Sequence, residues 1–234
     1  MVGRRTNGVG TASRTVPTSA RGLRTRASLI TAARVVFARD GYVNARITDI
    51  SRQAHVAAGS FYTYFNSKEE IFQAVFEAVQ EEMLHPRMGE TEVHADVAST
   101  IEANNRAYLD LYRRNARLMA VIEQVATIND EFRQMRLKRS WAFADRNARS
   151  IRRLQSLGLA DSKLDPEVAA KAIAGMVSRL AYSTYVLDDP IPFEVLVWTT
   201  TRMWLNALRI PEEPPSSNET AAPRPQGLES DTNF

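Results

Sequence analysis

The stretch HVAAGSFYTYFNSKEE, residues 55–70, is the most informative part of the sequence. It places four aromatic residues within five positions and follows them with a lysine and two acids. At about 100° per residue on a helix, Phe61, Tyr64 and Phe65 share one face, while Gly59 and Thr63 point the other way. The segment therefore predicts a short helix with one apolar face and one small, hydroxylated face.

Helix-start and helix-stop residues frame this segment on both sides. A first helix over residues 23–40 is expected to stop at Gly41, and Thr48 is expected to cap a short second helix that is joined to the aromatic helix by a tight turn. Ser67 and Glu70 form an S-x-x-E capping box that opens a fourth helix. Two short helices joined by a tight turn, the second with a small polar face, are typical of a helix-turn-helix.

The rest of the chain also has helical periodicity and no alternating strand pattern. Asp165 followed by Pro166 predicts a helix start, and Gly158 predicts a helix stop. The fold class expected is all-α with about nine helices, a three-helix DNA-binding domain being followed by a larger helical bundle with a two-helix dimer interface. The later helices are expected at 91–114, 116–127, 130–157, 165–187 and 192–209.

Composition excludes several classes of protein. The 234 residues include no cysteine, which excludes disulfides, thiolate zinc sites and cysteine nucleophiles. No apolar run reaches the roughly 18 to 20 residues that cross a bilayer. The chain has three histidines and no H-E-x-x-H, G-x-S-x-G or P-loop pattern. We expect a soluble, cytoplasmic protein that is not an enzyme and uses no cofactor or metal.

Charge is distributed unevenly along the chain. Residues 1–68 carry eleven Lys or Arg against two Asp, whereas residues 211–234 carry five acids against one Arg. This asymmetry indicates that the amino-terminal part meets a polyanion, most often nucleic acid, although a basic disordered tail alone gives a similar count.

A resemblance to the TetR family of bacterial transcriptional repressors is carried by the run AARVVFARDGYVNARITDISRQAHVAAGSFYTYFNSKEEIFQAV. The matching features are the G-Y pair at Gly41 and Tyr42, the V-x-x-G-S-F-Y-x-Y-F segment and the S-K-E-E that opens the fourth helix. Composition indicates a disordered basic arm at 1–22 and a disordered acidic, Pro-rich tail at 211–234. Between them the resemblance implies a helix-turn-helix domain at 23–68 and an effector-binding and dimerisation domain at 69–210.

The resemblance also implies DNA-contacting residues. Thr48 and Lys68 resemble phosphate-touching positions, and the small face of the aromatic helix aligns with groove-facing positions. Ala57 and Ala58 depart from the family pattern, since a hydroxyl cap and a basic residue are usual there, so phosphate contacts, thymine methyls or DNA shape would carry more of the recognition. The DNA-binding residues expected are Arg24, Arg26, Thr48, Gly59, Ser60, Tyr62, Thr63 and Lys68.

The last two helices are expected to form a homodimer interface, because both are apolar over more than one face. An intrachain core is the alternative for them. The interface residues expected are Ile173, Met176, Val177, Leu180, Thr184, Trp198 and Trp204.

The middle helices are rich in Met and aromatic residues. The resemblance implies an effector pocket there, and such walls with a few polar groups suit a small apolar molecule. A plain hydrophobic core is the alternative. The effector-binding residues expected are Asn105, Tyr108, Tyr112, Met119, Ile122, Glu123, Trp141 and Tyr182.

The function predicted is a sequence-specific DNA-binding regulator, a repressor that a small, largely apolar effector releases from a palindromic double-stranded operator. Its partners are thus DNA, the effector and a second copy of the chain, and no membrane. The main alternative is an architectural DNA-binding protein without an effector, and a ligand-sequestering module is a further one. Neither the effector nor the regulated genes follow from the sequence.

Overall fold

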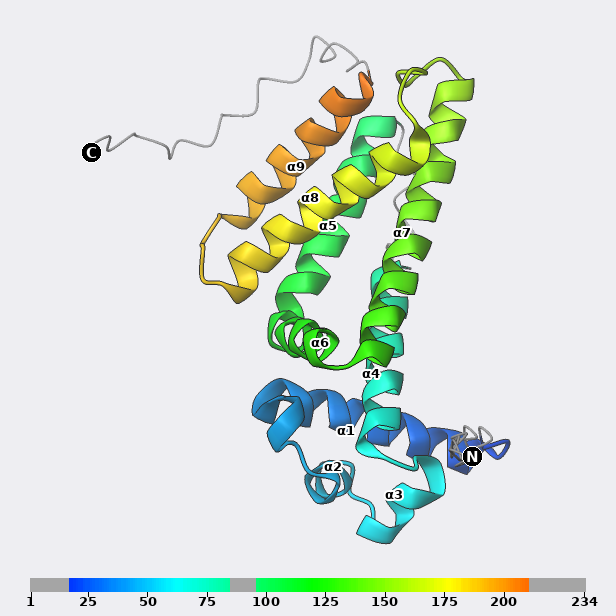
Figure 1. The fold of residues 1–234 in the computed structure, drawn as a ribbon, viewed down its shortest axis with the longest axis vertical. Helices are drawn as coiled ribbons and strands as arrows, with labels where there is room; N and C mark the ends of the chain where they lie inside the picture. The colour runs from blue at the N-terminus through cyan, green and yellow to red at the C-terminus, as the bar shows by residue number, and fades with distance from the viewer. Residues whose placement is uncertain (1–16, 85–95, 211–234) are drawn as a thin grey trace, which may run out of the picture. The chain divides into compact units, whose positions relative to one another are not determined.

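The computed structural model describes residues 17–84 and 96–210, and within these ranges the chain forms nine α-helices and no strand. The predicted all-α class is confirmed. No helix in the described ranges combines the length and the apolar character needed to cross a membrane. The helices are α1 (Ala20–Asn44), α2 (Ile47–Gln53), α3 (Ala58–Tyr64), α4 (Lys68–Leu84), α5 (Val97–Arg114), α6 (Ala116–Ile128), α7 (Asp130–Ser156), α8 (Pro166–Val186) and α9 (Phe193–Leu208) (Figure 1).

The chain divides into two compact units, residues 1–79 and 80–234. The division falls inside α4, whereas a boundary between residues 68 and 69 was predicted. The greater part of the predicted basic arm, residues 1–16, and the predicted acidic tail, 211–234, lie outside the described residues. The predicted start of the fifth helix, 91–95, also lies outside them.

The first unit is built around buried aromatic rings from α1, α3 and α4. Phe37, Phe61 and Phe65 are fully buried, and Phe72 is 1% exposed. The ring of Phe37 meets that of Phe72 edge-on with centroids 5.0 Å apart, and the rings of Phe61 and Phe65 lie 5.8 Å apart. The predicted apolar face of the aromatic helix is therefore its buried face, with Tyr64 half-buried beside it.

Helix α1 differs from the prediction at both ends. It begins at Ala20, because the Ser19 hydroxyl accepts a 3.1 Å hydrogen bond from the Gly22 N–H, so residues 20–22 are helical and do not belong to a disordered arm. At the other end Gly41 has φ 73° and ψ 176°. A residue with a Cβ would be strained in this backbone conformation, whereas glycine adopts it readily. The predicted stop at Gly41 is thus a break, beyond which helical turns continue to Asn44.

The predicted caps of the next helices are partly correct. Thr48 is the second residue of α2 and not its cap, a position that Arg46 occupies without a side-chain hydrogen bond. Ser67 does cap α4, since its hydroxyl accepts from the Glu70 N–H at 3.2 Å. The Glu70 carboxylate accepts from the Asn66 N–H at 2.6 Å, one residue earlier than a capping box requires.

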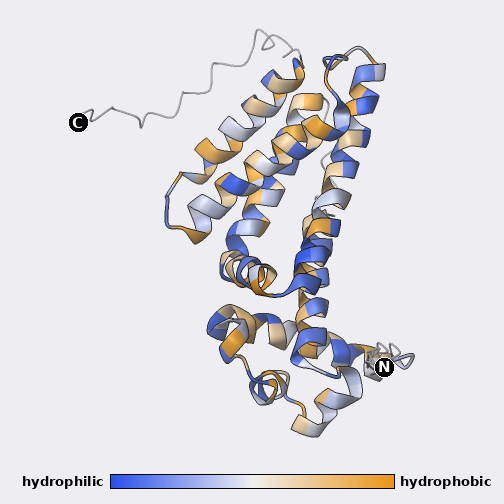
Figure 2. Cartoon of the chain, viewed as in Figure 1, coloured by the Kyte–Doolittle hydropathy of each residue, from blue (hydrophilic) through white to orange (hydrophobic). Residues whose placement is uncertain are grey.

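The second unit is a bundle in which α8 packs against α5, α6 and α7, and α5 packs against α9 (Figure 1). Asp165 caps α8 as predicted, accepting from the Val168 N–H at 2.8 Å, with Pro166 in the first turn. Figure 2 shows that α9 carries long hydrophobic stretches whereas α7 is largely hydrophilic.

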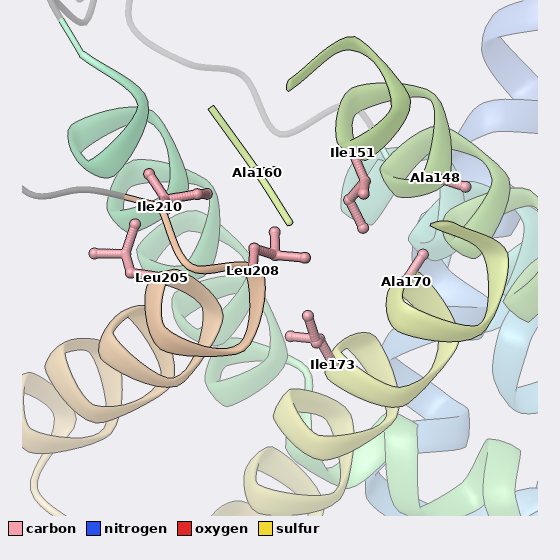
Figure 3. Packing of buried hydrophobic residues seen from close by; sticks show 8 residues of the cluster. All are labelled: Ala148, Ile151, Ala160, Ala170, Ile173, Leu205, Leu208 and Ile210. Atoms are coloured by element: carbon pink, nitrogen blue, oxygen red, sulfur yellow. The ribbon is translucent and has the colours of Figure 1, made fainter. Parts of the chain in front are cut away.

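A buried cluster joins α7, α8 and α9 (Figure 3). The loop between α7 and α8 takes part in it, since the Asp161 N–H donates to the Leu208 carbonyl at 2.8 Å. The Gln155 side-chain amide holds the same loop by donating to the carbonyls of Asp161 and Leu164, each at 2.9 Å. The buried members are Ala148, Ile151, Ala160, Ala170, Ile173, Leu205, Leu208 and Ile210.

Candidate nucleic-acid interface and small-molecule cavity

The turn between α2 and α3 has a defined backbone geometry. His55 has φ 56°, its N–H donates to the Arg52 carbonyl at 3.1 Å, and the Val56 N–H donates to the Ser51 carbonyl at 3.0 Å. These two bonds form the Schellman arrangement that closes helices at a left-handed residue. His55 therefore serves as the turn residue of the helix-turn-helix, which sets the direction in which α3 leaves α2.

Helix α3 offers its small face to solvent. Gly59, Tyr62 and Thr63 are exposed, Tyr62 at 52%, and Ser60 is half-buried. Phe61 between them is fully buried. A Cβ added at Gly59 would meet no atom within 4 Å, so this part of the helix is open. The predicted groove-facing residues thus share one accessible surface, whose DNA contacts stay a prediction.

The first unit also carries cationic side chains on α1 and next to α2. Arg24 on α1 is exposed, and the guanidinium of Arg26 lies 4.9 Å from the centroid of the Phe65 ring, at the end of α3. Thr48 is exposed in the first turn of α2. Arg46, an exposed residue at the cap of α2, is a further candidate for a DNA contact that was not predicted, although an Arg directly before a short helix was a usable signal.

Lys68 is engaged inside the first unit. Its Nζ donates to the carbonyls of Tyr42, Val43 and Ala45, at 2.9, 3.2 and 3.3 Å, and lies 4.7 Å from the centroid of the Tyr42 ring. The Tyr42 hydroxyl in turn donates to a Glu69 carboxylate oxygen at 2.7 Å, and burial together with this bond raises the pKa of Tyr42. These contacts favour a clamp between α4 and the end of α1 over the phosphate contact expected for Lys68.

Replacing Lys68 with Met tests the clamp. Hydrogen bonds to a charged group are individually worth more than neutral ones, and three carbonyls lose their donor, so we expect the free energy of unfolding to fall by about 2–3 kcal/mol. Urea unfolding of the full chain measures this, with Arg24→Met as the matched exposed control. Unchanged stability would contradict the clamp, and a salt dependence of DNA binding lower by about one unit for each bound copy of the chain would then assign Lys68 to a phosphate.

A cavity of ≈ 1050 Å³ lies in the second unit. Helices α5, α6, α7 and α8 supply most of its wall, and the end of α4 adds Gln80 and Met83. The rings of Tyr108 and Phe143 lie 5.7 Å apart in this wall, and those of Tyr108 and Tyr112 lie 6.0 Å apart. Tyr108 is half-buried in this wall, and its desolvation there raises the pKa of its hydroxyl. Among the described residues no cluster of three or more His, Asp or Glu side chains is placed to hold a metal ion.

Six of the eight residues expected to bind an effector line this cavity, namely Asn105, Tyr108, Tyr112, Met119, Glu123 and Tyr182. The other two do not. Ile122 is 3% exposed and packs in the core, because the cavity face of α6 follows Met119 and Glu123 at a four-residue step. Trp141 is 56% exposed, because it lies off the face of α7 that carries Phe143 and Asn147.

Most of the residues that α8 contributes to the cavity were not predicted from the sequence. Lys171, Gly175, Ser178 and Arg179 line it, together with Trp204 from α9. These residues lie on one face of α8, and the buried residues lie on another. One helix therefore contributes side chains to both the cavity and the core. The sequence pattern does not tell which residues of α8 line the cavity and which are in the core, because this depends on how α8 packs against its neighbours.

The set expected at the dimer interface needs correction. Ile173, Val177 and Thr184 are 7%, 4% and 8% exposed within a single chain, so they have no surface to offer to a partner. Trp204 lines the cavity. Met176 and Leu180 are half-buried, and Trp198 is 58% exposed. The outer surfaces of α8 and α9 also expose Val168 and Met203, which the prediction omitted.

Comparison with known proteins gives consistent results. Residues 29–75 match the model of the bacterial regulatory proteins of the tetR family. The HTH-type transcriptional regulator TtgR of Pseudomonas putida is 28% identical over 192 residues, which cover 76% of this chain and 89% of TtgR. The regulator ArpR of the same species, described as probable, has the same identity and coverage.

Solved structures share the fold. The fatty acid degradation regulator FadR from Bacillus halodurans superposes with a TM-score of 0.68 at 21% identity, covering 80% of this chain and 97% of FadR. Salmonella enterica GusR superposes with a TM-score of 0.66 at 18% identity, covering 80% and 96%. Together with the geometry of the matched segment, these similarities lead to one conclusion: residues 29–75 carry the helix-turn-helix of the bacterial regulatory proteins of the tetR family, in a chain that is similar over most of its length to HTH-type transcriptional regulators.

Proposed function

We propose that the protein is a cytoplasmic repressor that binds a palindromic operator as a homodimer and is released from it by a small, largely apolar effector. This proposal depends mainly on one observation. Helix α3 exposes a face with few large side chains, while Phe61 and Phe65 on its opposite face are fully buried and fix it to the first unit. A short helix held in this way can enter a major groove, and its own seven residues bury too little surface for tight binding by one copy.

The apolar outer surfaces of α8 and α9 support a homodimer. Trp198, Met203 and Val168 are each at least 45% exposed. Large exposed apolar side chains are common at interaction surfaces, and Trp is enriched among the residues that dominate interface energy. A second copy of the chain would bring a second α3 to the next turn of the duplex.

The cavity supports effector release. Gln80 and Met83 belong both to the cavity wall and to α4, the helix that begins at Lys68 and continues the chain from α3. A ligand that binds more tightly when α4 is in one position than in another shifts the population of the DNA-binding state. The size of the shift is limited by the difference between the two affinities. A coupling free energy of about 1–3 kcal/mol would change operator affinity roughly 5 to 150-fold.

Footprinting tests the proposal against the architectural alternative. The purified full chain is incubated with DNA taken from beside its own gene, and the protected positions are mapped. We expect one or a few short palindromes with half-sites about one helical turn apart, and native mass spectrometry should show the dimer mass. Broad protection without palindromes would favour an architectural protein. Absence of any salt-sensitive duplex binding would refute the proposal.

A further inference from the structure

The cavity of the second unit is long and narrow. Residues that line it recur on α7 from Arg136 to Leu157, which at about 1.5 Å per residue spans about 30 Å of helix. On α5 they recur from Val97 to Tyr112, which spans about 20 Å. Spread over a length of about 25 Å, the volume of ≈ 1050 Å³ gives a mean cross-section of about 40 Å². A ligand that fills the cavity is therefore long and thin.

The two ends of the cavity differ in polarity. Near the start of α7 the wall holds an ion pair, in which Nη2 of Arg136 lies 2.8 Å from Oε1 of Glu123. Gln124 and Thr127 of α6 line the same end. At the far end of α7 the wall is largely apolar, and its apolar residues are Val97, Ile101, Ile151, Leu154, Leu157 and Leu159. The cavity therefore matches a molecule with a polar group at one end and a long apolar part.

Gly175 of α8 leaves the wall open between these two ends. Lys171, Gly175 and Ser178 share one stripe of α8 and all line the cavity, so a side chain at position 175 would point into it. A Cβ built at Gly175 meets no atom within 4 Å. Lys171 and Ala144 together also line a smaller adjoining cavity, which places this part of α8 beside the middle of the lining face of α7.

Neither packing nor backbone conformation explains a glycine at position 175. No neighbouring atom excludes a side chain, and the backbone of α8 is helical there, without the positive φ found at Gly41 and Gly158. A glycine inside a helix is less favourable than an alanine, so it lowers stability here without any return in packing. Glycine does allow a ligand to approach the backbone closely. A ligand that passes against α8 at Gly175 accounts for the residue.

This inference rests on the proposed function: we propose that the effector is an unbranched, single-chain lipid that lies extended along the cavity. Its polar group lies near Glu123, and its chain passes Gly175 toward Leu154. A longer chain buries more apolar surface until the cavity is filled, so the affinity rises with chain length. The absence of a side chain at Gly175 determines how far the chain can reach.

A series of fatty acid salts tests the shape of the ligand. Isothermal titration calorimetry of the full chain measures the Kd of octanoate, undecanoate and hexadecanoate below their micelle concentrations. We expect one site per chain and a Kd that falls by up to about fourfold for each added methylene. Adamantane-1-carboxylate is the matched compact probe, because it carries as many carbon atoms as undecanoate and the same carboxylate. Its Kd should be about tenfold or more above that of undecanoate.

Gly175→Leu should obstruct the cavity between its ends. We expect the Kd of hexadecanoate to rise about tenfold or more, while that of octanoate changes little because the shorter chain fits on one side of the new side chain. Ala142→Leu is the matched control, because it adds the same side chain at an exposed position of α7 that does not line the cavity. The control should leave both constants unchanged.

Gly175→Ala separates a ligand-binding role from a structural one. Alanine is the better helix former and meets no neighbouring atom, so we expect the melting temperature to rise by about 2–4 °C. The Kd of hexadecanoate should rise at the same time, because the new methyl group narrows the cavity. A glycine required by the fold would give the opposite result, a lower melting temperature.

Several outcomes would overturn the proposal. They are no binding of any fatty acid in the series, a Kd that does not depend on chain length, an adamantane probe that binds as tightly as undecanoate, unchanged hexadecanoate binding in Gly175→Leu, an equal loss in Ala142→Leu, and a lower melting temperature of Gly175→Ala. Operator binding measured in the same preparations separates these results from the proposed function. A chain that binds its operator but shows no length dependence retains the function and loses the ligand class, whereas a chain that binds no duplex loses the function whatever the fatty acids show.

Discussion

Phe61→Ala should lower the free energy of unfolding by about 3–5 kcal/mol, because the Phe61 side chain is fully buried in the first unit and its removal leaves a cavity that the surrounding rings cannot fill. The Phe65 ring lies 5.8 Å away and the Tyr62 ring 5.4 Å away, so both lose a neighbour. The first unit comprises only residues 1–79, and a loss of this size is a large share of the stability of so small a unit. Operator binding should disappear with the fold of α3.

Urea unfolding of the full chain, followed by circular dichroism, measures the Phe61 effect. Thr63→Ala is the matched control, because Thr63 lies two residues away on the exposed face of the same helix and its replacement should change the stability by at most about 0.5 kcal/mol. If the two variants unfold at the same urea concentration, Phe61 does not anchor α3, and the assignment of the two faces is wrong.

Structural features that depend only on residues close together in the chain were predictable from the sequence. The period of Phe61, Tyr64 and Phe65 identifies the buried face of α3 without any tertiary information. The caps at Ser67 and Asp165 likewise depend on residues three positions apart, and both are observed. The cap expected at Thr48 failed, because a hydroxyl before an apolar series marks a helix start only to within a residue or two.

Features that depend on distant segments were not predictable. Lys68 donates hydrogen bonds to carbonyls 23 to 26 residues earlier in the chain, and no sequence pattern predicts those partners. The same limit explains the errors on α8, where Ile173 and Val177 were assigned to a partner chain and instead belong to the core of their own chain. The apolar residues of a helix can pack in the core, line a cavity or contact a partner chain, and periodicity alone does not distinguish these three cases.

The largest expected effect on DNA binding comes from replacing Tyr62 and Thr63 together with Ala. Both side chains are exposed on the open face of α3, and a specific contact of this kind contributes about 1–3 kcal/mol. Losing two such contacts should weaken operator binding by roughly two orders of magnitude or more, and a homodimer suffers the loss at both half-sites. Stability and dimer mass should remain nearly unchanged, because neither side chain is buried.

Electrophoretic shift of the operator fragment at moderate salt measures the loss, and its salt dependence identifies the cause. If Tyr62 and Thr63 contact bases, the double variant should lose the preference for the operator over unrelated DNA while its salt slope stays close to that of the wild type. Arg24→Gln should do the opposite, weakening binding to all sequences and reducing the slope by about one for each copy of the chain, or about two for the proposed homodimer. Tyr62→Phe keeps the ring and removes the hydroxyl, so it separates stacking or methyl contact from hydrogen bonding. A double variant that still shifts its operator selectively would place recognition elsewhere, in the basic residues of α1 or in the shape of the duplex.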